Sequence, residues 1–385
     1  MDKVNKMYYP RLNENAVADA IKNFPVVAIT GPRQCGKSTM ARHMLSGIDD
    51  VIFLDLERPS DVNKLNDPEW FFSSQKGKLI CIDEVQRKPE LFPIIRSLVD
   101  EWNRNGCFLI LGSASDELLK QSSESLAGRI VYKNLTPFLW NEAEKFHSLD
   151  SYIHKGGFPR SLLADDEHSF DWRESFISTF LERDLQLLNG FSIPTMRRLW
   201  QMLANMNGQT ANYTALASSL GVSSPTVKNY IDLLSGTFMI EIVRPFISNF
   251  GKRLVKSPKL YLTDSGITTA LLHLENFEAT SGHPVFGSLW EQIVLANLKG
   301  LFPRAEFFYY RTTNGAEVDF VMSYKGDLYA FECKASTSPS LTKGNFQAFD
   351  DINAKKSFIV APISERWIMK PTIEVIALKD LSSIA

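Results

Sequence analysis

The feature that most constrains this chain is the nine-residue segment 31–39, GPRQCGKST, which follows a short apolar run and opens a helical pattern. It matches the spacing GxxxxGK[ST], in which glycines let backbone N–H groups turn inward around phosphate oxygens. The following helix points the positive end of its dipole at the same anion. The segment therefore predicts a P-loop between a strand and a helix.

Short apolar runs, each followed by polar or turn residues, surround this loop in the first third of the chain. They lie at residues 25–30, 51–55, 79–83 and 107–112, with helical patterns such as residues 91–104 between them. Strands that alternate with helices predict a mostly parallel sheet that is covered on both faces. We therefore expect an α/β P-loop ATPase domain over residues 1–137.

The residue types of the loop suggest a role for each position. Lys37 is expected to reach the β and γ phosphates of ATP and to take part in catalysis, and Ser38 is expected to ligate Mg²⁺. The residues expected to contact the nucleotide are Gly31, Pro32, Arg33, Gln34, Cys35, Gly36, Lys37, Ser38 and Thr39. The sequence thus predicts ATP and Mg²⁺ as cofactors.

Two carboxylates follow the apolar run at residues 79–82 and complete the predicted hydrolysis site. Ligands of open parallel sheets bind at the carboxyl ends of the strands, which is where Asp83 falls. Asp83 would hold Mg²⁺, directly or through water, and Glu84 would polarise the attacking water. The alternative is that both acids only cap a strand-to-helix turn.

Two further residues are candidates for the same site. Ser113 follows the run at residues 107–112 and could sense the γ-phosphate, although ordinary turn chemistry also favours serine there. Arg129 is a candidate catalytic arginine that would contact the γ-phosphate from within the chain or from a neighbouring subunit. The alternative for Arg129 is an ordinary surface charge.

The region 138–280 is expected to be helical, with a winged helix at residues 213–234. Apolar spacing, a turn at Gly221 and a capping Ser223 or Ser224 predict a helix-turn-helix. Its solvent face would carry Thr226, Lys228 and Asn229.

Residues 236–243 resemble the two-stranded wing, and a basic stretch follows it. Its members are Arg244, Lys252, Arg253, Lys256 and Lys259, with Phe246 and Phe250 between them. The functional interpretation is a surface that follows nucleic-acid phosphates. The alternative is a module that packs against protein and leaves its lysines in water.

The region 281–385 carries four residues in an order typical of one class of nuclease. Glu291 lies in a helical pattern, Asp319 lies in a strand, and Glu332 and Lys334 lie two residues apart and so share one strand face. The carboxylates could hold Mg²⁺ against a scissile phosphate, and the lysine could orient water. This set resembles the PD-(D/E)XK restriction-endonuclease-like core, as in Holliday-junction resolvases. The alternative is a catalytically silent relic.

Composition excludes several other classes of protein. The formal net charge is −2, so no strongly basic surface dominates the whole chain. The four cysteines are scattered without a CxxC pair, which argues against a zinc site or a disulfide framework and fits a reducing cytoplasm. No apolar run approaches the ~20 residues that span a bilayer, so no membrane partner is expected.

The motifs together resemble a widespread prokaryotic family, an AAA-type P-loop ATPase followed by a domain of unknown function. The matching segments are GPRQCGKST, LICIDEVQ, LILGSAS, LAGR, GGFPR, LERDL, SPKLYLTDSGI, GAEVDF and FECK, which span nearly all of the chain from about residue 8 to about residue 380. The resemblance implies an ATPase core, a helical and winged-helix region and an endonuclease-like C-terminal domain. Ser113 departs from the Thr or Asn that many ATPases of this class carry.

Three functions follow from these patterns. The first is an ATP-driven, nucleic-acid-associated enzyme or remodelling factor with DNA as partner. The second is a nucleotide-switched factor that contacts a protein partner or another copy of itself and whose nuclease-like domain is silent. The third is Mg²⁺-dependent cleavage itself, carried out by Glu291, Asp319, Glu332 and Lys334.

Overall fold

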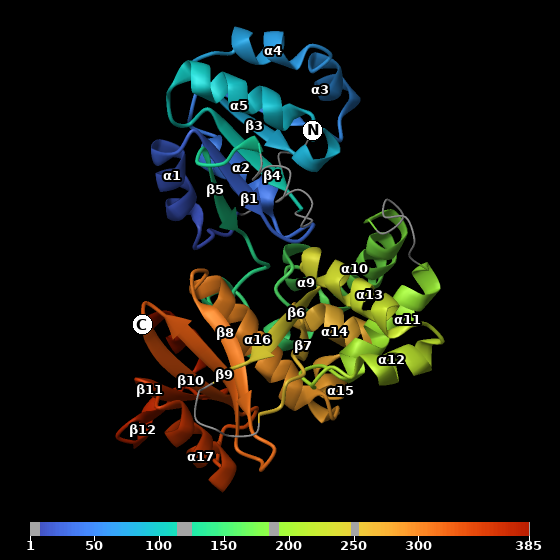
Figure 1. Ribbon diagram of the computed structural model, residues 1–385, viewed down its shortest axis with the longest axis vertical. Helices are drawn as coiled ribbons and strands as arrows, with labels where there is room; N and C mark the ends of the chain where they lie inside the picture. Colours follow the sequence, from blue (N-terminus) through green and yellow to red (C-terminus); the bar gives the residue numbers. More distant parts are fainter. Residues whose placement is uncertain (1–7, 114–124, 185–191, 248–253, 385) are drawn as a thin grey trace. The chain divides into compact units, whose positions relative to one another are not determined.

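The computed structural model describes residues 8–113, 125–184, 192–247 and 254–384. The chain divides into two compact units, Met1–Phe138 and Leu139–Ala385. Each is built around its own sheet (Figure 1). Across the described residues, no helix is both long and apolar enough to cross a membrane.

The first unit contains the parallel sheet that the sequence predicts. Its strands run in the order β2-β3-β4-β1-β5 and every neighbouring pair is parallel. The bounds are β1 Val26–Thr30, β2 Val51–Asp55, β3 Leu79–Asp83, β4 Phe108–Gly112 and β5 Ile130–Asn134. The four predicted strands are confirmed, and β5 is a further strand that the pattern did not predict.

Helices flank this sheet and bury apolar residues against it. Their bounds are α1 Glu14–Asn23, α2 Lys37–Leu45, α3 Pro59–Lys64, α4 Pro68–Ser74, η1 Val85–Arg87 and α5 Leu91–Trp102. Helix α5 buries an apolar stripe at helical spacing, and Trp102 at its end stacks on Phe108 of β4. This stacking anchors the helix across the centre of the sheet.

The second unit begins with helices, as expected. Their bounds are α7 Trp140–Ala143, α8 Leu149–Lys155, α9 Pro159–Leu162, α10 Asp166–Thr179, the π-helical turn η2 Phe180–Asp184, α11 Ile193–Asn205, α12 Tyr213–Leu220 and α13 Ser224–Gly236. The predicted helix-turn-helix is present as α12 and α13. Gly221 has a left-handed backbone between them, and the Ser223 hydroxyl accepts a hydrogen bond from the Thr226 N–H at 3.2 Å.

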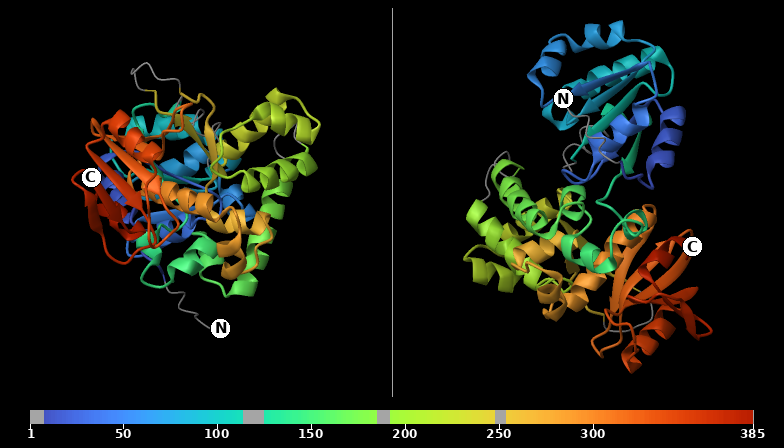
Figure 2. Two further views of the ribbon diagram at one scale, coloured as in Figure 1. Left: turned by 90° about the horizontal axis from the view of Figure 1, so that it is seen from below. Right: turned by 180° about the vertical axis from the view of Figure 1, so that it is seen from behind.

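The rest of this unit is organised around an eight-stranded mixed sheet (Figure 2). The strands are β6 Ile240–Pro245, β7 Lys259–Leu262, β8 Glu306–Arg311, β9 Glu317–Tyr324, β10 Asp327–Cys333, β11 Lys356–Val360, β12 Trp367–Lys370 and β13 Ile373–Ile376. The remaining helices are α14 Ser265–Leu271, α15 Phe277–Gly282, α16 Phe286–Leu301, α17 Lys343–Ile352 and η3 Leu378–Ser383. The order is β12-β13-β11-β10-β9-β8-β6-β7.

The strand pairing that follows the helix-turn-helix differs from the predicted wing. It does not lie within residues 236–243, because β6 pairs antiparallel with β7, which begins at Lys259. Strand β6 also pairs in parallel with β8. The strands that follow the helix-turn-helix therefore belong to the same sheet as the C-terminal strands, and the predicted boundary at residue 280 falls inside this unit.

Candidate functional site

The P-loop occupies the turn between β1 and α2. Gly31 has a φ of 151°, and a Cβ at this position would lie 2.0 Å from the Leu135 carbonyl oxygen. Gly36, with a φ of 104°, precedes the first residue of α2. Both positions favour glycine, so the loop forms a tight turn that leads directly into the N-terminus of α2.

Lys37 lies inside this turn. Its ammonium donates hydrogen bonds to the Gly31 and Pro32 carbonyls, each at 2.9 Å, and the residue is only 5% exposed. Among the other loop residues, the Arg33 guanidinium lies 3.5 Å from Glu57. Cys35 is fully buried, and its thiol donates to the Leu135 carbonyl at 3.4 Å. The lysine is therefore positioned to contact phosphate oxygens cradled by the loop.

The carboxylate at the end of β3 meets the loop. The order β3-β4-β1 brings the ends of these parallel strands to one edge of the sheet. There the Ser38 hydroxyl is hydrogen-bonded to the Asp83 carboxyl. Burial raises the pKa of Asp83, and the Ser38 hydrogen bond partly offsets this. A hydroxyl and a carboxylate side by side are the oxygen ligands that Mg²⁺ prefers, so these two residues fit the ion.

Glu84 belongs to a small polar network at the same edge. Its backbone is left-handed, with a φ of 56°, and burial raises the pKa of its carboxyl. The Gln86 side-chain nitrogen donates to this carboxylate and, at 3.1 Å, to the Ser113 hydroxyl. The structure thus brings Glu84 and Ser113 together through Gln86. Gln86 could not be identified from the sequence, because a polar residue after a strand carries no distinctive pattern.

Arg129 does not join this site within the chain. It directly precedes β5, and its carbonyl accepts a hydrogen bond from Val26 at the start of β1, whereas the P-loop follows the other end of β1. Five residues of strand, about 16 Å, separate the two ends. The guanidinium instead holds the Asp100 carboxylate with two hydrogen bonds of 2.5 and 2.9 Å. Arg129 therefore does not reach the P-loop of its own chain.

A second arginine contacts the back of the P-loop. The guanidinium of Arg11, a residue only 6% exposed, donates to the Cys35 carbonyl at 3.1 Å, to the Thr136 carbonyl at 2.7 Å and to the Pro137 carbonyl at 3.3 Å. It also lies 4.7 Å from the centre of the Phe138 ring. One buried side chain therefore ties the loop to the last residues of the first unit. Nothing in the local sequence around Arg11 distinguishes it from a surface arginine.

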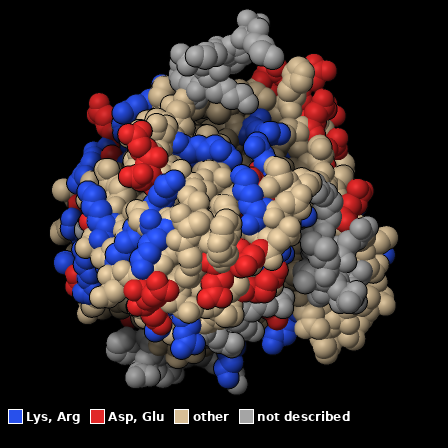
Figure 3. All heavy atoms as spheres, turned by 90° about the horizontal axis from the view of Figure 1, so that it is seen from above, with Lys and Arg blue, Asp and Glu red and all other residues tan. Residues whose placement is uncertain are grey.

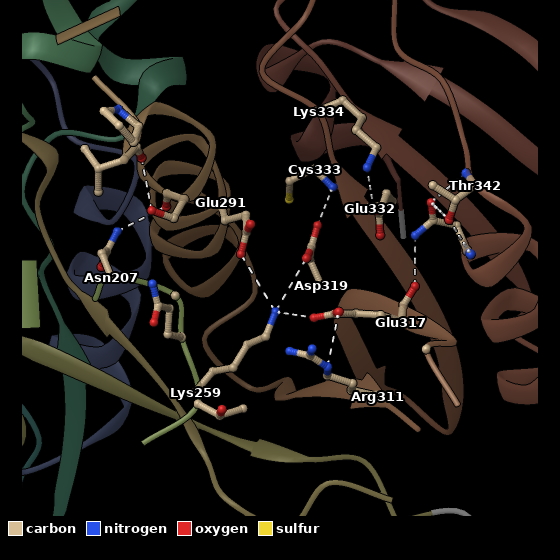
Figure 4. Close-up of a pocket in the computed structure, with 18 of the residues that line it drawn as sticks. Asn207, Lys259, Glu291, Arg311, Glu317, Asp319, Glu332, Cys333, Lys334 and Thr342 are labelled. Carbon is tan, nitrogen blue, oxygen red and sulfur yellow. Dashed lines mark hydrogen bonds and ion pairs between the residues drawn. The ribbon is translucent and has the colours of Figure 1, made fainter. Parts of the chain in front are cut away.

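The four nuclease-like residues line one pocket of about 900 Å³ in the second unit (Figure 4). Glu291 comes from α16, Asp319 from β9, Glu332 from β10, and Lys334 directly follows β10. The Lys334 ammonium donates to Glu332 at 2.7 Å, and Asp319 accepts the Cys333 N–H at 2.8 Å. The structure therefore brings together in one pocket four residues that the sequence only ordered along the chain.

Lys259 also points into this pocket, which corrects its predicted place on a basic surface. It is 4% exposed, and its nitrogen lies 2.9 Å from Glu317, 3.6 Å from Asp319 and 3.9 Å from Glu291 (Figure 4). Burial opposes the charge of Lys259, but the three carboxylates together raise its pKa above the ordinary value. Glu317 lies two residues before Asp319 on β9 and so shares its strand face. This spacing could have identified Glu317 from the sequence as a pocket residue.

Burial dominates the electrostatics of the pocket. Burial, together with the Asp319 charge, raises the pKa of Glu291 to about 7 and that of Glu332 to about 8. Across the residues that the structure describes, no three or more His, Cys, Asp or Glu side chains are grouped to hold a metal ion. Lys259 instead lies close to both Glu291 and Asp319. The metal role of the four residues stays a prediction.

The basic stretch after the helix-turn-helix forms part of a groove of about 620 Å³. Its basic side chains are Lys228 on α13, Arg244 on β6, and Lys256, and its aromatic ones are Tyr213, Phe246 and Phe308. Pro258 lines this groove, whereas the next residue, Lys259, lines the carboxylate pocket. Lys252, Arg253 and Phe250 lie outside the described residues.

One face of the molecule shows how its charges are distributed. On the face drawn in Figure 3, lysine and arginine side chains lie interspersed with aspartate and glutamate. This agrees with the formal net charge of −2 and indicates that no single sign covers this face. Any attraction for nucleic acid would therefore depend on local features such as the groove.

Three family models match successive parts of the chain. An AAA domain matches residues 23–144, a domain of unknown function (DUF8612) matches residues 146–278, and a second one (DUF4143) matches residues 286–381. The AAA match and the parallel five-stranded sheet identify the first unit as a P-loop ATPase fold.

Relatives extend over most of the chain. The uncharacterized protein Rv2008c of Mycobacterium tuberculosis is 39% identical over 357 residues, 92% of this chain and 80% of that protein. The uncharacterized protein MJ1544 of Methanocaldococcus jannaschii is 23% identical over 77% of this chain and 72% of its own length. A Walker-type ATPase of Pyrococcus abyssi has a TM-score of 0.49 at 14% identity, covering 70% of this chain and 97% of that one. The chain belongs to the family of the mycobacterial protein, and within it carries an AAA domain followed by DUF8612 and DUF4143.

Proposed function

We propose that this chain is a Mg²⁺-dependent ATPase that acts in association with nucleic acid. The observation that carries the proposal is the meeting of Lys37, the Ser38–Asp83 pair and Glu84 at one edge of the parallel sheet. This edge offers a cation for the phosphates, oxygen ligands for Mg²⁺ and a carboxylate for the attacking water. Bound Mg²⁺ would neutralise charge on the β and γ phosphates.

Different residues of the chain would have different roles in hydrolysis. Lys37 and the inward-facing N–H groups of the loop would bind and orient the phosphates. Glu84 would accept a hydrogen bond from the attacking water, with its carboxylate fixed by Gln86. The Ser113 hydroxyl accepts a hydrogen bond from the same Gln86 nitrogen. A contact between Ser113 and the γ-phosphate would therefore influence the position of the Glu84 carboxylate.

Two substitutions test the ATPase assignment. Lys37→Ala should abolish tight ATP binding, because the phosphates lose their buried cation. Glu84→Gln should leave ATP binding intact and lower turnover about a hundredfold or more, because the amide is a poor base. Isothermal titration and a phosphate-release assay measure the two effects separately. Normal hydrolysis by Glu84→Gln would show that the base has been assigned wrongly.

Nucleic-acid association is supported by the groove beside α13. Three basic and three aromatic side chains line it beside one acidic side chain, Asp232, so its formal charge is positive and its composition suits phosphates and stacked bases. ATP turnover should rise with duplex, branched or single-stranded DNA, and binding should weaken as salt increases. A Lys228→Gln, Arg244→Gln double variant should bind less tightly than Lys356→Gln, which changes an exposed lysine on β11. No DNA binding at low salt would contradict the proposal.

A second candidate function is phosphodiester cleavage in the carboxylate pocket. The restriction-endonuclease-like assignment is supported by the convergence of Glu291, Asp319, Glu332 and Lys334 in a pocket that also contains a buried Lys259. Asp319 and Glu332 would bind a divalent cation, and Lys334 would orient water. Mg²⁺- or Mn²⁺-dependent nicking should be lost in Asp319→Ala and Lys334→Ala. Nicking that survives both substitutions would come from elsewhere.

The alternative is a nucleotide-switched factor that contacts a protein, with a silent pocket. The observation that favours it is the Lys259 ammonium, which already neutralises carboxylates that a metal would need. Nucleotide-dependent capture of one protein partner, with no DNA retained, would support it over the first proposal.

A further inference from the structure

The carboxylate pocket already contains a cation of its own. The Lys259 ammonium lies within 4 Å of carboxylate oxygens from three residues, Glu291, Glu317 and Asp319. These residues come from α16 and β9, whereas Lys259 begins β7. A buried lysine costs free energy unless carboxylates pair with it, so the arrangement is a built charge site.

The charges that face the pocket indicate what would replace this lysine. Its lining holds four carboxylates, Glu291, Glu317, Asp319 and Glu332, against three basic side chains, Lys259, Arg311 and Lys334. With His283 neutral, the formal sum is −1. Without Lys259 the sum becomes −2, which equals in magnitude the charge of one divalent cation.

A second observation indicates a ligand in the same pocket. Glu332 is 4% exposed, and its Oε1 accepts a hydrogen bond from Lys334. Its Oε2 is buried and has no hydrogen-bond partner among the described residues. A buried carboxylate oxygen without a hydrogen-bond partner destabilises the folded state, so this atom is suited to a ligand that enters the pocket.

We propose that the Lys259 ammonium holds the cation position of this pocket, so that a divalent cation binds Asp319 and Glu332 only by displacing the ammonium from Asp319. The inference rests on the second candidate function, because it concerns the same carboxylates. It gives the pocket two forms, one neutralised by lysine and one loaded with a metal ion. Removal of the lysine charge should therefore create a stronger metal site.

The experiment measures Mn²⁺ binding to the full chain without nucleotide, by the electron paramagnetic resonance signal of free Mn²⁺. Lys259→Met should bind Mn²⁺ at least about tenfold more tightly than the unaltered chain. Lys299→Met is the matched control, because Lys299 pairs with Glu241 outside the pocket, and it should bind as the unaltered chain does. Adding Asp319→Asn to Lys259→Met should remove the gain.

Equal Mn²⁺ affinities for Lys259→Met and the unaltered chain would overturn the inference. Thermal melting covers the case in which Lys259→Met folds poorly, since Mn²⁺ should then raise its Tm much more than that of the unaltered chain. A variant that stays unfolded at every Mn²⁺ concentration would also count against the inference. The nicking assay is independent: its failure would remove the cleavage function while leaving the cation exchange to be judged by Mn²⁺ binding alone.

Discussion

The side-chain nitrogen of Gln86 donates a hydrogen bond to the Ser113 hydroxyl at 3.1 Å, and the same nitrogen donates to the Glu84 carboxylate. Ser113 follows β4 and Glu84 follows β3, so one amide links the ends of two adjacent strands. The side chain proposed to activate water is thereby connected to the one proposed to sense the γ-phosphate. Gln86 contacts neither Lys37 nor the loop in these bonds, which makes it a positioning residue.

Gln86→Ala should lower the kcat for ATP hydrolysis about tenfold or more, while the KM for ATP changes little. The reason is that Glu84 loses the donor that fixes its carboxylate, whereas the phosphate-binding loop is untouched. Steady-state kinetics separate the two parameters. Gln75→Ala, which changes an amide bonded locally at the end of α4, is the control. A rise in KM with unchanged kcat would contradict the positioning role.

Arg11→Met should destabilise the first unit by about 2–4 kcal/mol and raise the KM for ATP. The methionine removes the cation that lies over the Phe138 ring and leaves the carbonyls of Cys35, Thr136 and Pro137 without their donor. Urea unfolding and ATP titration measure the two effects. Lys22→Met, at the exposed end of α1, is the control. An Arg11→Met protein as stable as the unaltered chain would show that water replaces the guanidinium without loss.

Arg129→Ala tests whether the arginine acts between chains. Because Arg129 precedes β5 at the edge away from its own P-loop, any contact with a γ-phosphate must come from a neighbouring copy. We expect Arg129→Ala and Lys37→Ala each to lose turnover, and their mixture to recover part of it by pairing an intact loop with an intact arginine. If Arg129→Ala alone hydrolyses ATP normally at high protein concentration, the residue only pairs with Asp100 on the surface.

Asp264 gives the second unit a pH-dependent stability. Burial raises its pKa from 3.8 to about 6, although the N–H groups of Gly157 and Ile267 and the Arg173 charge act in the opposite direction. The folded state therefore binds the proton more tightly than the unfolded state. Asp264 therefore contributes fully to the free energy of unfolding below about pH 4. This contribution, about 3 kcal/mol, is lost as pH rises through 6.

The unfolding free energy of the unaltered chain, minus that of Asp264→Asn, should fall by this amount between pH 4 and pH 7. Urea unfolding at several pH values measures it. His154 titrates in an overlapping window with the opposite sign, because burial lowers its pKa to about 4. Its effect largely cancels in the difference between the two proteins. A difference that does not vary with pH would place the Asp264 pKa near its ordinary value.

The sequence predicted those parts of the fold that local patterns encode. Continuous apolar runs identified β1 to β4, and the glycines at positions 31 and 36 identified the loop, because each signal lies within a few residues. Strand β5 was missed because its residues are half-buried or exposed, so its apolar pattern is broken. Its place beside β1 is fixed by pairing across about a hundred residues of chain.

The residues of the carboxylate pocket also divide into those that a local pattern predicts and those that only long-range strand pairing places there. Glu332 and Lys334 were predicted to share a strand face because strand geometry repeats every two residues. Their side chains form an ion pair, although β10 ends at Cys333, one residue before Lys334. Lys259 was assigned to a basic surface because its neighbours in the sequence are basic. Only the pairing of β7 with β6, and of β6 with β8, carries it to the carboxylates. Such long-range pairing has no signature in a short window.

Pro258 and Lys259 are separated by a single peptide bond, yet they line different surfaces, the basic groove and the carboxylate pocket. A peptide bond is planar and rigid, so the two residues cannot move independently over more than a small distance. A nucleic acid that seats itself in the groove would push on the same short piece of backbone that carries the ammonium among the carboxylates. Binding in the groove and cation exchange in the pocket would then be coupled through the backbone of these two residues.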